Sequence, residues 1–154
     1  MSDAMSDAIS EGAPLFRRVA VIGLGLIGSS FCRALKRHGL AGHVVGHARS
    51  QATRDKAMEL GFLDSVEADP AAAARDADLV MLCTPVGTYA AIAEAIGPAI
   101  APDAVISDVG SVKQAVIRDV GPHVPEGAHL IPGHPVAGTE HSGPEAGVAE
   151  LFDG

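Results

Sequence analysis

Residues 19–28 read Val-Ala-Val-Ile-Gly-Leu-Gly-Leu-Ile-Gly. A short apolar run that favours a strand leads directly into glycines spaced G-x-G-x-x-G, and a helical pattern follows. In such a unit Gly23 permits the tight turn, Gly25 lets the backbone approach a pyrophosphate, and Gly28 lets the helix pack close to the strand. The context predicts a dinucleotide site, and the alternative is a structural turn that only looks like this fingerprint.

The start of the predicted helix, at Leu26 and Ile27, is the candidate anion site. The first N–H groups of a helix lack partners within it, and its amino end carries the positive end of the helix dipole. We therefore expect the phosphates of a dinucleotide to lie over these residues.

The residues just after the second predicted strand indicate which cofactor the site prefers. Enzymes that use NAD usually carry an acidic residue about 20 residues past the glycines, which bonds the ribose 2′-hydroxyl. The first acid after Gly28 is Asp55, and Arg49 and Ser50 stand at the expected place, with Arg54 one turn later. Cationic and hydroxyl donors suit a 2′-phosphate. The sequence therefore favours NADP over NAD, the alternative being that Arg49 is only a solvated loop residue.

From Arg17 onward, apolar runs alternate with helical stretches, which predicts an α/β fold with a Rossmann-type, doubly wound, mostly parallel sheet. The expected strands are Val19–Ile22, His43–Gly46, Leu79–Cys83, Ala104–Ser107 and His129–Ile131. The expected helices are Leu26–Arg37, Gln51–Leu60, Pro70–Arg75, Tyr89–Ile96 and Val112–Val120.

We expect residues 1–16 to form a flexible tail and residues 17–154 to form one NAD(P)-binding domain. The chain stops where a doubly wound sheet would continue with a further strand, so we expect the domain to be truncated at its carboxyl end.

Composition excludes several classes of protein. The chain has 154 residues, of which 47% are hydrophobic, and a formal charge of −8, which argues against a nucleic-acid binder held by a basic face. No apolar run approaches the roughly 20 residues needed to span a bilayer, and the amino terminus does not resemble a signal peptide. Cys32 and Cys83 form no disulfide framework, so a reducing, cytoplasmic setting is expected.

Two further strand ends carry candidate site residues. Thr84 and Pro85 follow the strand that ends at Cys83, where they either line the cofactor cleft or merely punctuate the chain. Ser111 follows the next strand, at the start of a predicted helix. Because serine is a common helix cap, composition alone favours a capping role over a catalytic one.

His134 follows the last predicted strand by a few residues, and so belongs at the same edge of the sheet. A histidine beside a nicotinamide is a natural general base for a hydroxyl that must lose its proton, although a surface or structural histidine is the simpler alternative. His129, His134 and His141 do not form a recognised metal-ligand spacing, and no metal is expected.

The order of four motifs resembles the amino-terminal domain of the prephenate dehydrogenase family, which includes the arogenate and cyclohexadienyl dehydrogenases of tyrosine biosynthesis. The motifs are GLGLIGSS at 23–30, CTPV at 83–86, DVGSVK at 108–113 and GHPVAGTEHSG at 133–143. The last two are much more specific than the glycine fingerprint.

This resemblance implies an oxidative decarboxylation of prephenate or arogenate, with a hydride passing to NAD(P)+. It implies that His134 accepts the proton of the 4-hydroxyl group and that Ser111 holds that hydroxyl and the histidine in line. Lys113 and Arg118 lie near the matching motifs, but we expect them to be solvated helix charges.

Family members carry a second, helical domain that supplies most of a homodimer interface and binds the substrate's carboxylates, and that half is absent from this sequence. The chain alone is therefore expected to bind cofactor without necessarily turning over substrate. Two other hypotheses are a non-catalytic dinucleotide-binding module and a related oxidoreductase with another small acid substrate.

Overall fold

A computed structural model of the chain describes residues 13–133. Its strands are β1 (Phe16–Ile22), β2 (Ala41–His47), β3 (Ser65–Glu67), β4 (Leu79–Leu82), β5 (Val105–Asp108) and β6 (His129–Ile131). Its α-helices are α2 (Leu26–Arg37), α3 (Gln51–Leu60), α4 (Pro70–Ala74), α5 (Tyr89–Ile96) and α6 (Lys113–Val120). Short 3₁₀ turns η1 (Val86–Thr88), η2 (Gly97–Ala99) and η3 (Gly121–His123) join some of them.

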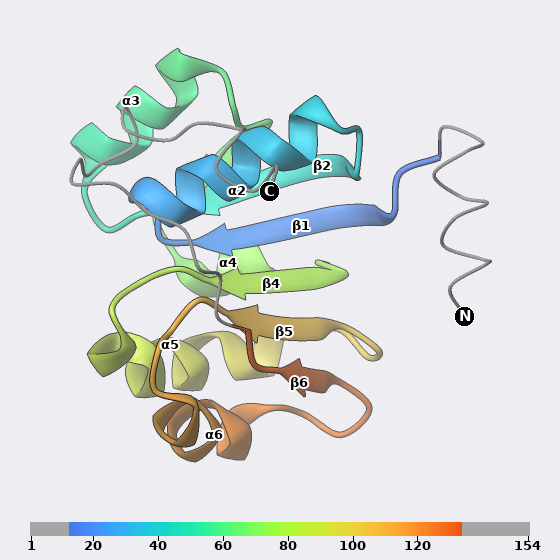
Figure 1. Ribbon diagram of the computed structural model, residues 1–154, viewed down its shortest axis with the longest axis vertical. Helices are drawn as coiled ribbons and strands as arrows, with labels where there is room; N and C mark the ends of the chain where they lie inside the picture. Colours follow the sequence, from blue (N-terminus) through green and yellow to red (C-terminus); the bar gives the residue numbers. More distant parts are fainter. Residues whose placement is uncertain (1–12, 134–154) are drawn as a thin grey trace.

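The six strands form one sheet in the order β3-β2-β1-β4-β5-β6, and every pairing is parallel (Figure 1). This is the order of a doubly wound Rossmann sheet, as the sequence predicted. Figure 1 shows α2 and α3 beside the β1–β2 half, and α5 and α6 beside the β4–β6 half. The chain reverses its direction of winding between β1 and β4, which lie next to each other.

Side-chain alternation along the central strands separates two apolar layers. In β1, Val19 and Val21 belong to the core under α2 and α3, whereas Ala20 and Ile22 belong to the core under α4, α5 and α6. All four side chains are fully buried. Strands covered on both faces need continuous apolar runs, which is why the sequence shows no polar alternation here.

Local sequence signals explain the helix limits. Ser50 and Asp69 cap α3 and α4 by accepting hydrogen bonds from Thr53 N and Ala71 N. At its other end α3 stops at Gly61, which adopts a left-handed conformation with φ 79°. The limits of α2, α3 and α5 agree with those predicted from the sequence.

One strand differs from the prediction. The sequence indicated five strands, and the described sheet has a sixth, β3, near the middle of the chain. β3 has only three residues, all half-buried, and forms by pairing with Val45–His47 of β2. Strand β1 begins at Phe16, the last residue of the expected tail.

No helix within residues 13–133 is long and apolar enough to cross a lipid bilayer.

Candidate cofactor and active site

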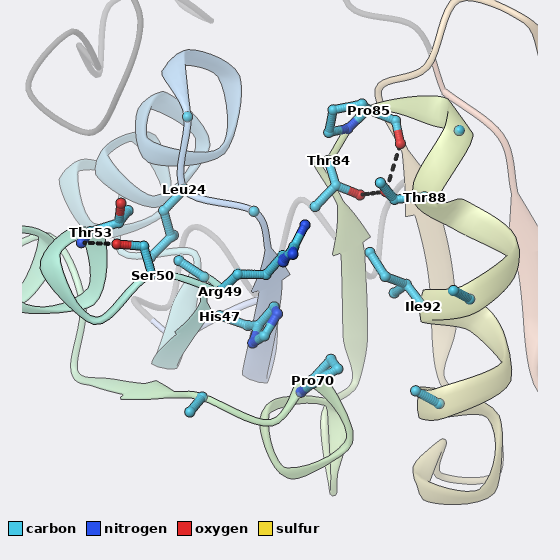
Figure 2. Close-up of a pocket in the computed structure, with 17 residues that line it drawn as sticks. Leu24, His47, Arg49, Ser50, Thr53, Pro70, Thr84, Pro85, Thr88 and Ile92 are labelled. Carbon is cyan, nitrogen blue, oxygen red and sulfur yellow. Dashed lines mark hydrogen bonds between the residues drawn. The ribbon is translucent and has the colours of Figure 1, made fainter.

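A cleft of about 880 Å³ opens at the carboxyl ends of β1, β2 and β4. Ligands of open α/β sheets bind at this place, where the direction of winding reverses. The cleft is lined by residues from four segments: the turn after β1, the end of β2 with the start of α3, the β3–α4 connection, and the segment from Thr84 into α5 (Figure 2). Its walls include six residues predicted from the sequence, namely Gly23, Gly25, Arg49, Ser50, Thr84 and Pro85.

The glycine turn has the backbone geometry that the fingerprint requires. Gly23 has φ 105°, and a β-carbon there would lie 2.8 Å from the carbonyl carbon of Cys83. A β-carbon on Gly28 would lie 1.9 Å from the carbonyl oxygen of Gly23, so α2 packs against the turn with no room for a side chain. Both glycines are therefore required by the fold, whatever the cleft binds.

The amino end of α2 begins directly after Gly25, which lines the cleft. Gly25 occupies the cap position, makes no side-chain cap hydrogen bond, and has no atom within 4 Å of where a β-carbon would stand. The first turn of the helix carries no acidic residue. The next residues, Leu26, Ile27 and Gly28, begin the helix behind Gly25 and do not belong to the described lining. This end of α2 has the space and the polarity for an anion.

Arg49 and Ser50 lie exposed on the β2–α3 turn. Figure 2 shows the Arg49 side chain extending into the cleft between this turn and Thr84. The Ser50 oxygen accepts from Thr53 N at 3.4 Å, which leaves its hydroxyl proton available for donation. Arg54 differs from expectation, because its Nη1 donates to the carbonyl oxygens of Ala48 and Arg49, each at 2.8 Å. Arg54 thus stabilises the backbone of the β2–α3 turn.

His47 is a cleft residue that sequence reasoning missed. It ends β2, is 5% exposed, and its Nδ1–H donates to the Glu67 carbonyl at 3.1 Å. Burial lowers the pKa of this imidazole, although the Glu67 hydrogen bond acts in the opposite direction. The ring is therefore disposed to remain neutral, with Nε2 as an acceptor. Its position at the end of a strand that enters the cleft was the available signal.

The opposite wall is held by two threonines. The Thr88 hydroxyl lies 2.8 Å from Thr84 Oγ1 and 2.7 Å from the Pro85 carbonyl oxygen (Figure 2). These contacts close the turn between β4 and α5, so that Thr84 and Pro85 face the cleft together. Cys83, directly before them, is half-buried, and desolvation of its thiol together with the Asp108 carboxylate raises the thiol pKa to about 12. Cys83 is thus an inert thiol at neutral pH.

Ser111 is not a helix cap, contrary to the prediction from composition. Helix α6 begins at Lys113, and Val112 occupies the cap position without a side-chain cap hydrogen bond. Ser111 lies exposed in the preceding turn, after β5. The expectation for Lys113 was also wrong, because its ammonium lies 2.7 Å from the carboxylate of Asp108, whose side chain is fully buried. Arg118, by contrast, is 73% exposed and paired with Asp119, in accord with a solvated charge.

His134 lies outside the described residues, and so does the rest of the motif that follows it. The described chain reaches Gly133, directly before it, after β6 has returned to the cleft edge of the sheet. Within residues 13–133 no group of three or more His, Cys, Asp or Glu side chains could hold a metal ion.

The family model for the prephenate dehydrogenase nucleotide-binding domain matches residues 31–154. The chain belongs to the prephenate dehydrogenase family. A cyclohexadienyl dehydrogenase of Zymomonas mobilis is 46% identical over 139 residues, which are 90% of this chain and 47% of that protein. A prephenate dehydrogenase of Bacillus subtilis is 31% identical over 88% of this chain and 37% of its own length.

Solved structures of the prephenate dehydrogenase family have the same fold. The prephenate dehydrogenase of A. aeolicus, crystallised with hydroxyphenyl propionate and NAD+, matches with a TM-score of 0.79 and 32% identity, covering 88% of this chain and 47% of that one. The Synechocystis arogenate dehydrogenase matches with a TM-score of 0.79 and 33% identity, covering 88% of this chain and 46% of that one. The chain therefore spans about half the length of these relatives.

Proposed function

We propose that this chain is the cofactor-binding half of a dehydrogenase that oxidatively decarboxylates prephenate or arogenate with NADP+. The observation that carries the proposal is the cleft at the reversal of the sheet, bounded by the Gly23–Gly28 turn and by the β2–α3 turn. Membership of the prephenate dehydrogenase family supports a nicotinamide cofactor, as does the NAD+ named with the A. aeolicus relative.

The residues present fit a dinucleotide. The space above Gly25 admits a pyrophosphate close to the amino end of α2, because nothing stands within 4 Å of its β-carbon position. The first N–H groups of that helix, at Leu26, Ile27 and Gly28, then serve as donors. Thr84 and Pro85 would contact the cofactor from the opposite wall.

The β2–α3 turn supports the preference for NADP+ over NAD+. Ala48 and Arg49 follow the buried end of β2, so no carboxylate stands there to bond a ribose 2′-hydroxyl. Arg49 and the Ser50 hydroxyl instead present donors at the rim, which suits a 2′-phosphate. Arg54 supports this turn by donating to the carbonyl oxygens of Ala48 and Arg49.

His134 and Ser111 are the proposed catalytic residues. When bound, the nicotinamide accepts the hydride that leaves the ring carbon bearing the 4-hydroxyl. His134 takes the hydroxyl proton as the carbonyl forms, and Ser111 holds that hydroxyl in line. The ring carboxylate then leaves as carbon dioxide, the electron pair of the broken bond makes the ring aromatic and passes to the carbonyl oxygen, and that oxygen takes a proton back as the phenol forms. Aromatisation makes the sequence favourable, so the protein mainly positions the reactants and moves one proton.

The first test is a calorimetric titration of this chain with NADP+ and, separately, with NAD+. We expect clear preference for NADP+. Preference for NAD+ would overturn the interpretation of Arg49 and Ser50, and binding of neither would overturn the proposed cofactor site. Turnover is then measured with prephenate and with arogenate. The protein for this assay contains this chain and extends to the full length of its relatives. The molar mass of that protein in solution tests the homodimer, which we propose from the resemblance alone.

A further inference from the structure

The buried carboxylate of Asp108 is bonded from three directions at the end of β5. Its Oδ2 accepts from Gly110 N at 2.7 Å and from Lys113 Nζ at 2.7 Å, and its Oδ1 accepts from Gly133 N at 3.1 Å. The Asp108 side chain is fully buried, whereas that of Lys113 is 32% exposed. A buried carboxylate needs such partners, because an unpaired buried charge is strongly destabilising.

The same group of contacts holds both polar atoms of Gly133. Its N–H donates to Asp108, and its carbonyl oxygen accepts from Lys113 Nζ. A β-carbon on Gly133 would lie 2.9 Å from the Asp108 carbonyl oxygen, so the chain passes close to the end of β5 with no space for a side chain. Just upstream, Ser107 Oγ donates to the Ile131 carbonyl at 2.6 Å. The exit of β6 is therefore fastened to the end of β5.

These contacts also fix the Ser111 turn. Gly110 and Lys113, which flank Ser111 and Val112, are both bonded to one oxygen of Asp108. Two segments separated by at least 20 residues in the chain are thus held by a single carboxylate. One of them carries Ser111, and the other leads by one peptide bond into His134.

The cofactor cleft lies beside this group of contacts. Asp108 pairs in register with Leu82 of β4, and the Val109 N–H donates to the Leu82 carbonyl at 3.2 Å. The residues directly after Leu82 lead to Thr84 and Pro85 in the cleft wall. A displacement of Gly133 or of the Ser111 turn would therefore change the distance between the catalytic groups and the cofactor.

We infer that the Asp108–Lys113 ion pair is a positioning device that fixes the Ser111 turn and the Gly133 end of β6, the segment that continues in sequence to His134, beside the cofactor cleft. This inference rests on the proposed function, because it concerns the same reaction. Neither residue is assigned contact with the substrate. Both act through the backbone that carries the catalytic pair, and misplacement by about 1 Å is enough to cost roughly 100-fold in rate.

The test compares Lys113→Gln and Asp108→Asn in a protein carrying this chain at the full length of its relatives. We expect kcat to fall by about 10- to 100-fold in both variants, with the Kd for NADP+ within about twofold of wild type. Lys113→Arg, which keeps the charge, should recover part of the loss. Because Lys113 is partly exposed, its variants remain informative if Asp108→Asn does not fold.

A matched control removes an ion pair of the same chemistry on the opposite flank of the sheet. The Asp64 carboxylate accepts from Lys36 Nζ at 2.7 Å and from Val44 N at 2.7 Å, and it lies just before β3. Asp64→Asn should lower stability without changing kcat at a temperature where the protein is folded. A fall in kcat equal to that of Asp108→Asn would overturn the positioning role.

A double variant separates positioning from general damage. If Lys113 acts through His134, the Lys113→Gln change should slow a His134→Asn protein far less than it slows the wild type. If the loss of kcat in the double variant equals the product of the two single losses, the inference is overturned. Wild-type kcat in both Lys113→Gln and Asp108→Asn would overturn it as well. Absence of turnover in the wild-type protein would overturn the proposed function and the positioning role with it. Wild-type turnover with unaffected variants would overturn the positioning role alone.

Discussion

A β-carbon added to Gly28 would lie 1.9 Å from the carbonyl oxygen of Gly23. The overlap involves backbone on both sides, so no side-chain rotation relieves it. We expect Gly28→Ala to destabilise the domain by at least about 2 kcal/mol and to lower Tm by roughly 4–8 °C. Thermal unfolding followed by circular dichroism measures this, and a Tm equal to that of the wild type would contradict the close approach.

Gly25 provides the contrasting substitution in the same turn. Its φ of −79° suits any residue, and the space around its β-carbon position is open. We therefore expect Gly25→Ala to change the free energy of unfolding by no more than about 1 kcal/mol. The same substitution should weaken NADP+ binding by tenfold or more, because the methyl group occupies the place of the pyrophosphate. Calorimetric titration and thermal unfolding of the same preparation separate the two effects. Unchanged NADP+ affinity would contradict the binding of the pyrophosphate at this turn.

Arg49 should determine the preference between the two nicotinamide cofactors. A charge-assisted hydrogen bond contributes about 1.5–3 kcal/mol to binding. Arg49→Gln should therefore weaken the affinity for NADP+ by roughly 10- to 100-fold and leave the affinity for NAD+ nearly unchanged. Arg118→Gln makes the same change in net charge at a 73% exposed side chain on α6 and serves as control. Equal losses for both cofactors, or the same loss in the control, would argue against a contact with the 2′-phosphate.

Burial of His47 links stability to pH. Its folded pKa lies below the ordinary value of 6.5, so in acid the unfolded chain binds more protons than the folded one. The contribution of His47 is complete above about pH 6.5 and is lost as the pH falls through the folded pKa. Denaturant unfolding between pH 5 and 8 should show this loss, and His47→Gln should reduce it. His129→Gln, at an exposed position on β6, should leave the slope as in the wild type.

His134 and Ser111 should affect turnover and not cofactor binding. A neutral imidazole is needed to accept the hydroxyl proton, so kcat should fall as the histidine becomes protonated in acid. His134→Asn should remove that limb of the pH profile and most of the activity, and Ser111→Ala should lower kcat by about 10- to 100-fold. A His134→Asn protein with intact turnover would disprove the proton-acceptor role.

Much of the fold is predictable because its signals are local. The strand–glycine–helix unit at residues 19–28 specifies the first crossover, and the apolar run of each central strand reflects burial on both faces. Strand β3 escaped prediction because Ser65–Glu67 is short and half-buried, and it becomes a strand only by pairing with β2.

The sequence by itself determined the fold class, the six cleft residues at the ends of β1, β2 and β4, and the family, since each depends on residues close together in the chain. Only the tertiary structure decided the roles of Arg54, Lys113 and Asp108. Lys113 looks like a solvated helix charge until the parallel sheet brings Gly133, 20 residues later, beside the end of β5. Such contacts arise from the order in which strands pair, and no local pattern encodes them.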